Sequence, residues 1–173
     1  METLPRRKLN RLRDYDYSRN GAYHIVICVQ NDQPLLGTIP VGANCVRPPA
    51  PSPIHLSDIG QIVEQEIHIM ATSYDRLTVE KYVIMPDHIH LLLLIQTVDI
   101  THVGANCVRP PAPTVSRVVK QFKGAVTKKI GCSIWQKSFY DRVIRNEREY
   151  LETWQYIGSN PRQRKFDMTN HEQ

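Results

Sequence analysis

The chain has 173 residues, of which 41% are hydrophobic, and its 22 Lys and Arg residues against 17 Asp and Glu residues give a formal net charge of +5. This length favours one domain with a sizeable core, and the modest positive charge suits a polyanionic partner without requiring one. No run reaches the roughly 18 apolar residues of a membrane helix, and the basic first residues lack the apolar stretch of a signal peptide. The four cysteines have no CxxC spacing, so we expect a reduced, cytoplasmic protein with no membrane partner.

The beginning of the chain predicts a basic arm followed by a strand. Residues 1–20 contain five Lys and Arg residues before position 14, and we expect this arm to precede a domain at 21–167 and a polar tail at 168–173. Ala22–Val29 is rich in β-branched and aromatic residues, which indicates a strand. The stretch from Gln30 to Pro53 is rich in turn residues.

The middle of the chain predicts a helix and two strands. Apolar residues recur at helical spacing from Ile59 to Met70, and Ser57 with Asp58 stands where an N-cap is expected. Leu77–Met85 and His88–Ile95 are then predicted strands, joined by a tight turn at Pro86-Asp87. The second strand, HIHLLLLI, is apolar on both faces after its histidines, which is typical of a central strand covered by helices.

The last third predicts helix, strand and helix. Thr114 precedes a helix, TVSRVVKQFKGAVTKKI, with one apolar stripe and lysines largely away from it. Phe139–Arg145 is a predicted edge strand, and Asn146 with Glu149 resembles the capping box of a final helix that ends at Asn160-Pro161. The order of elements predicts an α+β fold: one domain with a mostly antiparallel sheet and helices packed on it.

One segment of eleven residues, VGANCVRPPAP, occurs twice, at Val41–Pro51 and Val103–Pro113. Both copies fall between predicted elements, and two copies do not make the regular period of a solenoid. We therefore interpret them as insertions in loops that the fold tolerates.

The first candidate site is the pair His88 and His90. Alternate residues of a strand share one face, so both imidazoles can reach one cation, and two imidazoles with an oxygen ligand suit a divalent ion such as Mg²⁺ or Mn²⁺. The alternative is a pair of hydrogen-bonded histidines on a half-exposed strand, and the motif alone leaves both open.

The second candidate is on the final helix. Tyr156 and Asn160 are four residues apart and therefore lie on one helix face. A tyrosine hydroxyl can act as a nucleophile, and an amide oxygen beside it can complete the coordination of a metal. Taken alone, the same pair can be a boundary tyrosine and a helix terminator.

Together these segments resemble a known family. VIMPDHIHLLLLI, the basic helix after it and IWQKSFYDRVIRNEREYLETWQYIGSNP resemble the IS200-like single-tyrosine transposases, above all the REP-associated tyrosine transposases, and GAYHIVICVQND resembles the first strand of that branch. The resemblance spans roughly residues 14–167 apart from the two repeats. It implies a ferredoxin-like or RRM-like HUH nuclease core.

The resemblance also implies an activity and its residues. His88 and His90 match the histidine–hydrophobic–histidine motif, Tyr156 matches the nucleophile, and Asn160 matches the amide that assists the metal, Mg²⁺ or Mn²⁺. The reaction implied is cleavage and strand transfer of single-stranded or hairpin DNA through a 5′-phosphotyrosine, by a monomer or homodimer in the cytoplasm and associated with the nucleoid. Basic side chains of the helix from Thr114 would contact the DNA backbone: Arg117, Lys120, Lys123, Lys128 and Lys129.

Without the resemblance, the residues leave other interpretations open. The lysines can be an ordinary solvated face, and Tyr150 and Tyr140 compete for the nucleophile, although the residue four positions after Tyr150 is Trp154 and not an amide. A non-catalytic RRM-like nucleic-acid-binding protein has the same element order but needs aromatic residues on its sheet. A metal-dependent hydrolase would need a carboxylate base, for which Asp87 is the neighbour in sequence.

The codons that can encode the two repeats suggest a hypothesis about their origin. Gly42-Ala43-Asn44 can be written GGG GCG AAC and Val46-Arg47-Pro48 GTT CGC CCC, which are reverse complements on either side of one Cys45 codon. Gly104–Pro110 has the same property. We infer that both stretches are translated copies of a mobile palindromic repeat.

Overall fold

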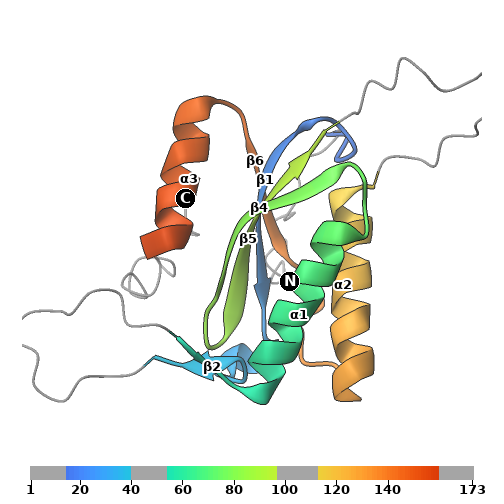
Figure 1. The fold of residues 1–173 in the computed structure, drawn as a ribbon, viewed down its shortest axis with the longest axis vertical. Coiled ribbons are helices and arrows are strands. Elements are labelled where there is room, and N and C mark those ends of the chain that lie inside the picture. Colours follow the sequence, from blue (N-terminus) through green and yellow to red (C-terminus); the bar gives the residue numbers. More distant parts are fainter. Residues whose placement is uncertain (1–14, 40–53, 97–112, 160–173) are drawn as a thin grey trace, which may run out of the picture.

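The computed structural model describes residues 15–39, 54–96 and 113–159 and has an α+β architecture. Four strands form one antiparallel sheet in the order β4-β5-β1-β6 (Figure 1). These strands are β1 (Gly21–Cys28), β4 (Leu77–Ile84), β5 (His88–Ile95) and β6 (Tyr140–Ile144). The predicted fold class is therefore confirmed. Within the described ranges, no helix is both long and apolar enough to cross a membrane.

The strands follow the sequence prediction closely. β5 lies between β4 and β1, as its double apolar character indicates, and β6 is an edge strand. The first strand begins and ends one residue earlier than predicted, because Val29 leaves the ladder and forms an isolated bridge with Trp135.

Each helix begins at the cap that the sequence predicts. At α1 (Asp58–Thr72) the Ser57 hydroxyl accepts a hydrogen bond from the Gly60 amide, and at α2 (Val115–Ile130) Thr114 accepts one from Arg117. α3 (Glu147–Ser159) begins after Asn146, whose side-chain oxygen accepts from the Glu149 amide at 2.9 Å. These bonds satisfy amides that have no partner inside the helix.

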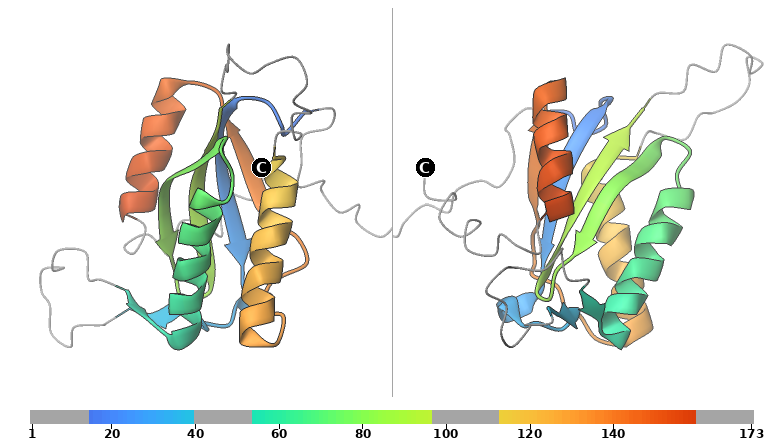
Figure 2. Two further views of the ribbon diagram at one scale, coloured as in Figure 1. Left: turned by 45° about the vertical axis from the view of Figure 1, so that its right-hand side comes forward. Right: turned by 60° about the vertical axis from the view of Figure 1, so that its left-hand side comes forward.

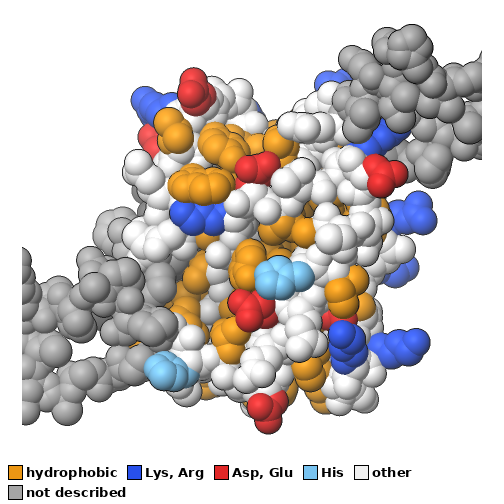
Figure 3. Space-filling view, in the orientation of Figure 1, with side chains coloured by type: hydrophobic (Ala, Val, Ile, Leu, Met, Phe, Trp, Pro, Cys, Tyr) orange, Lys and Arg blue, Asp and Glu red, His pale blue; other side chains and the backbone are white. Residues whose placement is uncertain are grey.

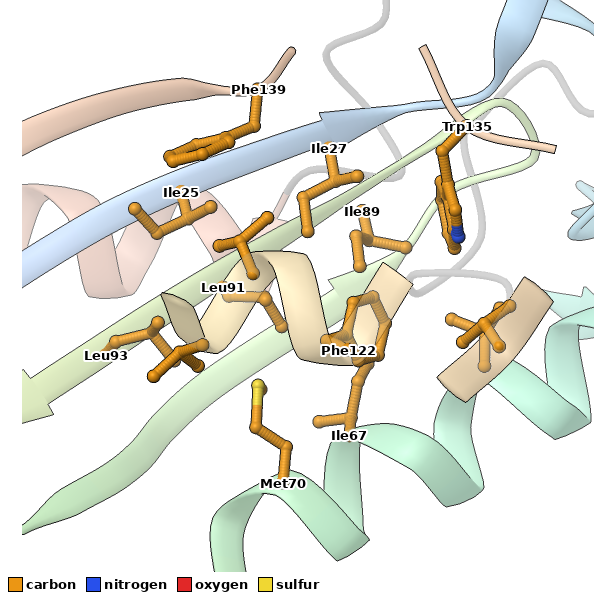
Figure 4. Close-up of a cluster of buried hydrophobic side chains, with 14 of the residues drawn as sticks. Ile25, Ile27, Ile67, Met70, Ile89, Leu91, Leu93, Phe122, Trp135 and Phe139 are labelled. Carbon is orange, nitrogen blue, oxygen red and sulfur yellow. The ribbon is translucent and has the colours of Figure 1, made fainter. Parts of the chain in front are cut away.

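The helices cover the two faces of the sheet unequally (Figures 1 and 2). α1 and α2 lie on one face, and their apolar stripes form the main core with alternate residues of β1 and β5 (Figure 4). α3 lies on the opposite face, where its Ile157 forms a smaller cluster with Ala22, Leu92 and Ile144 of the sheet. Since successive strand residues face opposite ways, position along each strand decides which layer a side chain enters.

Two short strands were not predicted. β2 (Gly37–Thr38) pairs with β3 (His55–Leu56) beside a short 3-10 helix at Gln30–Asp32. They lie within and just beyond the stretch from Gln30 to Pro53 that is rich in turn residues. Both repeats fall between elements, one between β2 and β3 and the other between β5 and α2, and all but Pro113 lie outside the described residues.

Candidate active site

The two histidines of the motif share one face of β5, the face away from α1 and α2. His90 is 3% exposed and His88 is half-buried, and their Nε2 atoms are 3.0 Å apart. The predicted convergence of the two imidazoles is thus present in the structure.

The turn before β5 orients the first of them. Asp87 lies in this turn, and its carboxylate is 2.7 Å from His88 Nδ1. A carboxylate only accepts, so Nδ1 of a neutral His88 donates and Nε2 carries the lone pair. Carboxylates orient metal-binding histidines in this way, so Asp87 acts on His88 rather than standing apart as a base.

A third histidine, which the sequence did not indicate as functional, completes the cluster. His24 of β1 places Nε2 3.0 Å from His90 Nδ1, and the two rings stack with centroids 5.2 Å apart. His24 pairs with Leu92 across the sheet, so it is diagonal to His90. The signal in the sequence was one polar residue in an apolar strand, but its partner depends on a register between strands about 60 residues apart.

The cluster keeps its central histidine uncharged. Burial lowers the pKa of His90 well below its usual range, and the neighbouring imidazoles of His24 and His88 lower it further. A neutral imidazole is the form that binds a metal.

Tyr156 is the tyrosine that meets this cluster. Its ring packs edge-on against His90 and His24, with centroid distances of 5.4 and 6.0 Å. The next residue, Ile157, is 1% exposed and fixes this part of α3 to the sheet. The structure therefore brings together Tyr156, His88 and His90 from two elements.

The competing tyrosines have other surroundings. The Tyr150 hydroxyl donates to Glu80, and burial together with this carboxylate raises the pKa of Tyr150, which makes it a poorer nucleophile. Tyr140 is on the same sheet face as His90, but Val26 of β1 separates the two residues in the cross-strand row. Tyr140 is exposed to 41%.

The histidine pair has the spacing of a metal chelate. Two imidazole nitrogens that bind one divalent ion at about 2.1 Å, at an angle of roughly 90–110°, lie about 3.0–3.4 Å apart. The 3.0 Å between the two Nε2 atoms fits this range. Among the described residues no group of three or more His, Cys, Asp or Glu side chains is arranged to hold a metal. Asn160, the predicted third ligand, lies outside those residues, so its role stays a prediction.

The basic side chains of α2 are on the other side of the sheet from Tyr156. Lys and Arg side chains gather along the edge of the molecule that α2 forms (Figure 3). Two of the five predicted DNA contacts are engaged within the fold: Lys129 is 2.7 Å from Glu66, and Lys123 donates to the carbonyls of Gln136 and Ser138. Arg117, Lys120 and Lys128 are exposed. DNA binding by this helix stays a prediction.

Two basic residues that the sequence analysis did not select flank the histidines. Arg142 of β6, His24, Leu92 and Lys81 of β4 form one cross-strand row on the face of Tyr156. Arg142 is 3.7 Å from Glu149, and the Lys81 ammonium lies 4.5 Å from the ring centroid of Trp154. Lys81 and Arg142 thus place one positive charge on each side of the cluster, in the case of Arg142 beside the Glu149 carboxylate.

Comparison with solved structures supports the fold. The fold matches the structure of a REP-associated tyrosine transposase bound to a REP hairpin, with a TM-score of 0.60 and 20% identity over 88% of this chain and 73% of that one. The fold is that of this transposase. A provisionally assigned transposase from Deinococcus radiodurans matches at a TM-score of 0.47 and 18% identity, over 87% of this chain and 96% of that one.

The sequence comparisons give no family. No family model matches the chain. An uncharacterised protein of Haemophilus influenzae is 28% identical over 172 residues, which covers 90% of this chain and 88% of that protein.

Proposed function

We propose that the chain cleaves and rejoins single-stranded DNA with Tyr156 as its nucleophile, in a reaction that depends on a divalent metal. The observation that carries the proposal is the contact of the Tyr156 ring with His90, whose Nε2 faces His88 Nε2 at 3.0 Å. A nucleophile beside two nitrogens that can bind a metal is an arrangement suited to phosphodiester cleavage.

The covalent step balances without an external energy source. The Tyr156 hydroxyl loses its proton and its oxygen bonds to the phosphorus, while the bond to the 3′ oxygen breaks and that oxygen gains a proton. The products are a 5′-phosphotyrosine and a free 3′-OH. A 3′-OH from another strand can reverse the step, which converts cleavage into strand transfer without ATP.

His88, His90 and Asn160 are the residues that would hold the metal, Mg²⁺ or Mn²⁺. When bound, such an ion polarises a non-bridging phosphate oxygen and holds the phosphate for in-line attack. Asp87 orients His88, and the small apolar cluster around Ile157 holds α3 so that Tyr156 stays against the histidines. Lys81 and Arg142 provide positive charge on the same face.

We propose hairpin-forming DNA as the substrate, bound by a monomer or homodimer in the cytoplasm, in association with the nucleoid. The structural neighbour with the TM-score of 0.60 is bound to a REP hairpin, and this chain contains two segments whose codons can be palindromic. These two observations support the same class of DNA.

The two rival functions fit the site less well. An RRM-like binder exposes aromatic residues over its sheet, whereas α3 covers part of this face and the central strands present His24, His88 and His90. A hydrolase that activates water needs a carboxylate base, and Asp87 is engaged with His88.

The decisive experiment is covalent trapping. With Mn²⁺ or Mg²⁺ and a hairpin oligonucleotide with a single-stranded flank, the wild-type chain should give a slowly migrating covalent complex. Tyr156→Phe removes only the hydroxyl, so DNA binding should persist while the adduct falls below detection. Tyr150→Phe is the matched control and should form the adduct normally. An adduct that survives in Tyr156→Phe and disappears in Tyr150→Phe would exclude the assignment.

A further inference from the structure

Three histidines and one carboxylate form a continuous chain of contacts. It runs from Asp87 to His88 at 2.7 Å, from His88 to His90 at 3.0 Å and from His90 to His24 at 3.0 Å. His90, in the middle, uses both ring nitrogens and is 3% exposed. A buried imidazole without a partner on one nitrogen is costly. Which nitrogen of His90 carries the proton therefore depends on both neighbours.

Within this chain of contacts, counting donors assigns the protons when the histidines are neutral. Each neutral imidazole has one N–H and one lone pair, and the Asp87 carboxylate only accepts. His88 must therefore donate from Nδ1 and accept at Nε2. It follows that His90 donates from Nε2 and accepts at Nδ1, and that His24 donates from Nε2.

This arrangement cannot bind a metal at His90. Coordination through Nε2 of both His88 and His90 needs a lone pair on each, and His88 already has one. His90 must instead carry its proton on Nδ1, which faces His24 Nε2. That atom of His24 must then accept where before it donated.

We propose that His24 is the positioning residue of the metal site, because it can both donate to His90 and accept from it. Without metal, His24 Nε2–H donates to His90 Nδ1. With metal, the proton shared by these two nitrogens belongs to His90, the proton on His90 Nε2 leaves to solvent, and His24 takes one proton from solvent on its Nδ1. For three neutral imidazoles this exchange leaves each of them neutral and releases no net proton.

The inference rests on the metal site of the proposed function but concerns a different property of it. His24 does not bind the metal: it faces Nδ1 of His90, the nitrogen opposite the one that faces His88. Its effect passes through His90, and metal affinity measures that effect without any DNA or cleavage.

The direct test is nitrogen-15 NMR of histidine-labelled wild-type protein, with Zn²⁺ as a diamagnetic probe. We expect the His90 proton on Nε2 without metal and on Nδ1 with Zn²⁺, and the His24 proton on Nε2 without metal and on Nδ1 with it. A His90 that carries its proton on Nδ1 in both conditions would overturn the proposal.

Two variants test the same point through binding of Mn²⁺, measured by calorimetry. His24→Leu fills similar space but neither donates nor accepts, so it should bind Mn²⁺ about 10–100-fold more weakly than wild type. His24→Gln has an amide that can turn to donate or to accept, and should recover most of that affinity. His68→Leu is the control, because His68 lies on α1 in the opposite layer, beside Tyr82. Equal affinities in wild type and His24→Leu would refute the role of His24.

Failure of this inference is distinguishable from failure of the proposed function. A covalent adduct with Tyr156, together with metal binding that ignores His24, leaves the function standing and removes the inference. Metal affinity that depends on His24, without any covalent adduct, supports the inference and removes the proposed function. Thermal unfolding of each variant shows whether it is folded, and the NMR test on wild type decides the proposal if His24→Leu does not fold.

Discussion

Burial of His90 explains why single residues matter so much in this site. Its ring lies between His24 and His88 and against Tyr156, and almost none of it reaches solvent. Because burial lowers its pKa, the ring stays neutral and its two nitrogens act through their direction rather than their charge. A change at any neighbour therefore alters what His90 can bind.

Removal of the two metal-binding imidazoles should separate binding from chemistry. We expect His88→Ala combined with His90→Ala to abolish cleavage with Mn²⁺ or Mg²⁺, while most of the salt-dependent DNA binding remains, because phosphate contacts come from Lys and Arg. EDTA should have the same effect on the wild-type chain. Gel assays of cleavage and of binding over a range of salt concentrations measure both. Full cleavage in EDTA would contradict the role of the metal.

Residue-level prediction succeeded where it depended on local periodicity. The alternation of a strand is enough to put His88 and His90 on one face, whereas the pairing of Tyr156 with Asn160 stays a prediction, because Asn160 lies outside the described residues. His24 could not be assigned, because the cross-strand register places it diagonal to His90 and the sequence does not state that register. Prediction of the whole site needs both local periodicity and cross-strand register.

At the scale of elements, caps and apolar stripes predicted each helix, but not the layer it occupies. α2 presents Val118, Val119 and Phe122 to the sheet, and an identical stripe would pack equally well on either face. Because α2 lies on the sheet face opposite α3, its lysines lie away from Tyr156. The basic residues next to the histidines are Lys81 and Arg142, on strands whose neighbours in the sheet are set by topology.

Lys123 and Lys120 of α2 should behave differently when each is replaced by Met. Lys123 donates hydrogen bonds to the backbone carbonyls of Gln136 and Ser138, and Lys123→Met would leave both carbonyls without this donor. Lys123→Met should therefore lower the free energy of unfolding by about 1–3 kcal/mol. Lys120 is exposed, so Lys120→Met should change it by less than about 0.5 kcal/mol. Urea unfolding measures both.

DNA binding by the same variants tests the predicted role of α2. If Lys120 contacts a phosphate, Lys120→Met should reduce the slope of log affinity against log salt by about one. An unchanged slope for Lys120→Met and for Lys128→Met would show that DNA does not lie along this helix and would favour the site face.

At the scale of the whole molecule, the site lies on the four-stranded sheet, and both repeats are inserted in connections between elements rather than in its strands. Thr38 and His55 are paired across β2 and β3, so the chain leaves and re-enters the fold at adjacent points around the first repeat. The second repeat lies between the end of β5 and the start of α2. Pro113, its last residue, is buried just before the Thr114 cap and belongs to the fold.

Deletion of the repeats should therefore leave folding and cleavage largely intact. Removal of Val41–Pro51 leaves five residues between the paired Thr38 and His55, a length that suits a hairpin loop. Shortening this loop from 16 to five residues reduces its closure cost by about 1 kcal/mol. Removal of 103–112 keeps Pro113 in place. We expect the double deletion to unfold at a similar or slightly higher temperature and to form the Tyr156 adduct at the wild-type rate.

The same deletion tests whether the repeats act as protein or only as translated DNA. If VGANCVRPPAP binds DNA or a partner, its loss should weaken hairpin binding even though the fold is intact. If it is a palindrome that landed in frame, binding should not change, and the gene should show inverted repeats on either side of the Cys45 and Cys107 codons. Unrelated, non-palindromic codons at the two places would rule out that origin. Sequencing and one binding curve therefore decide whether these segments are relics of the kind of DNA that we propose as the substrate.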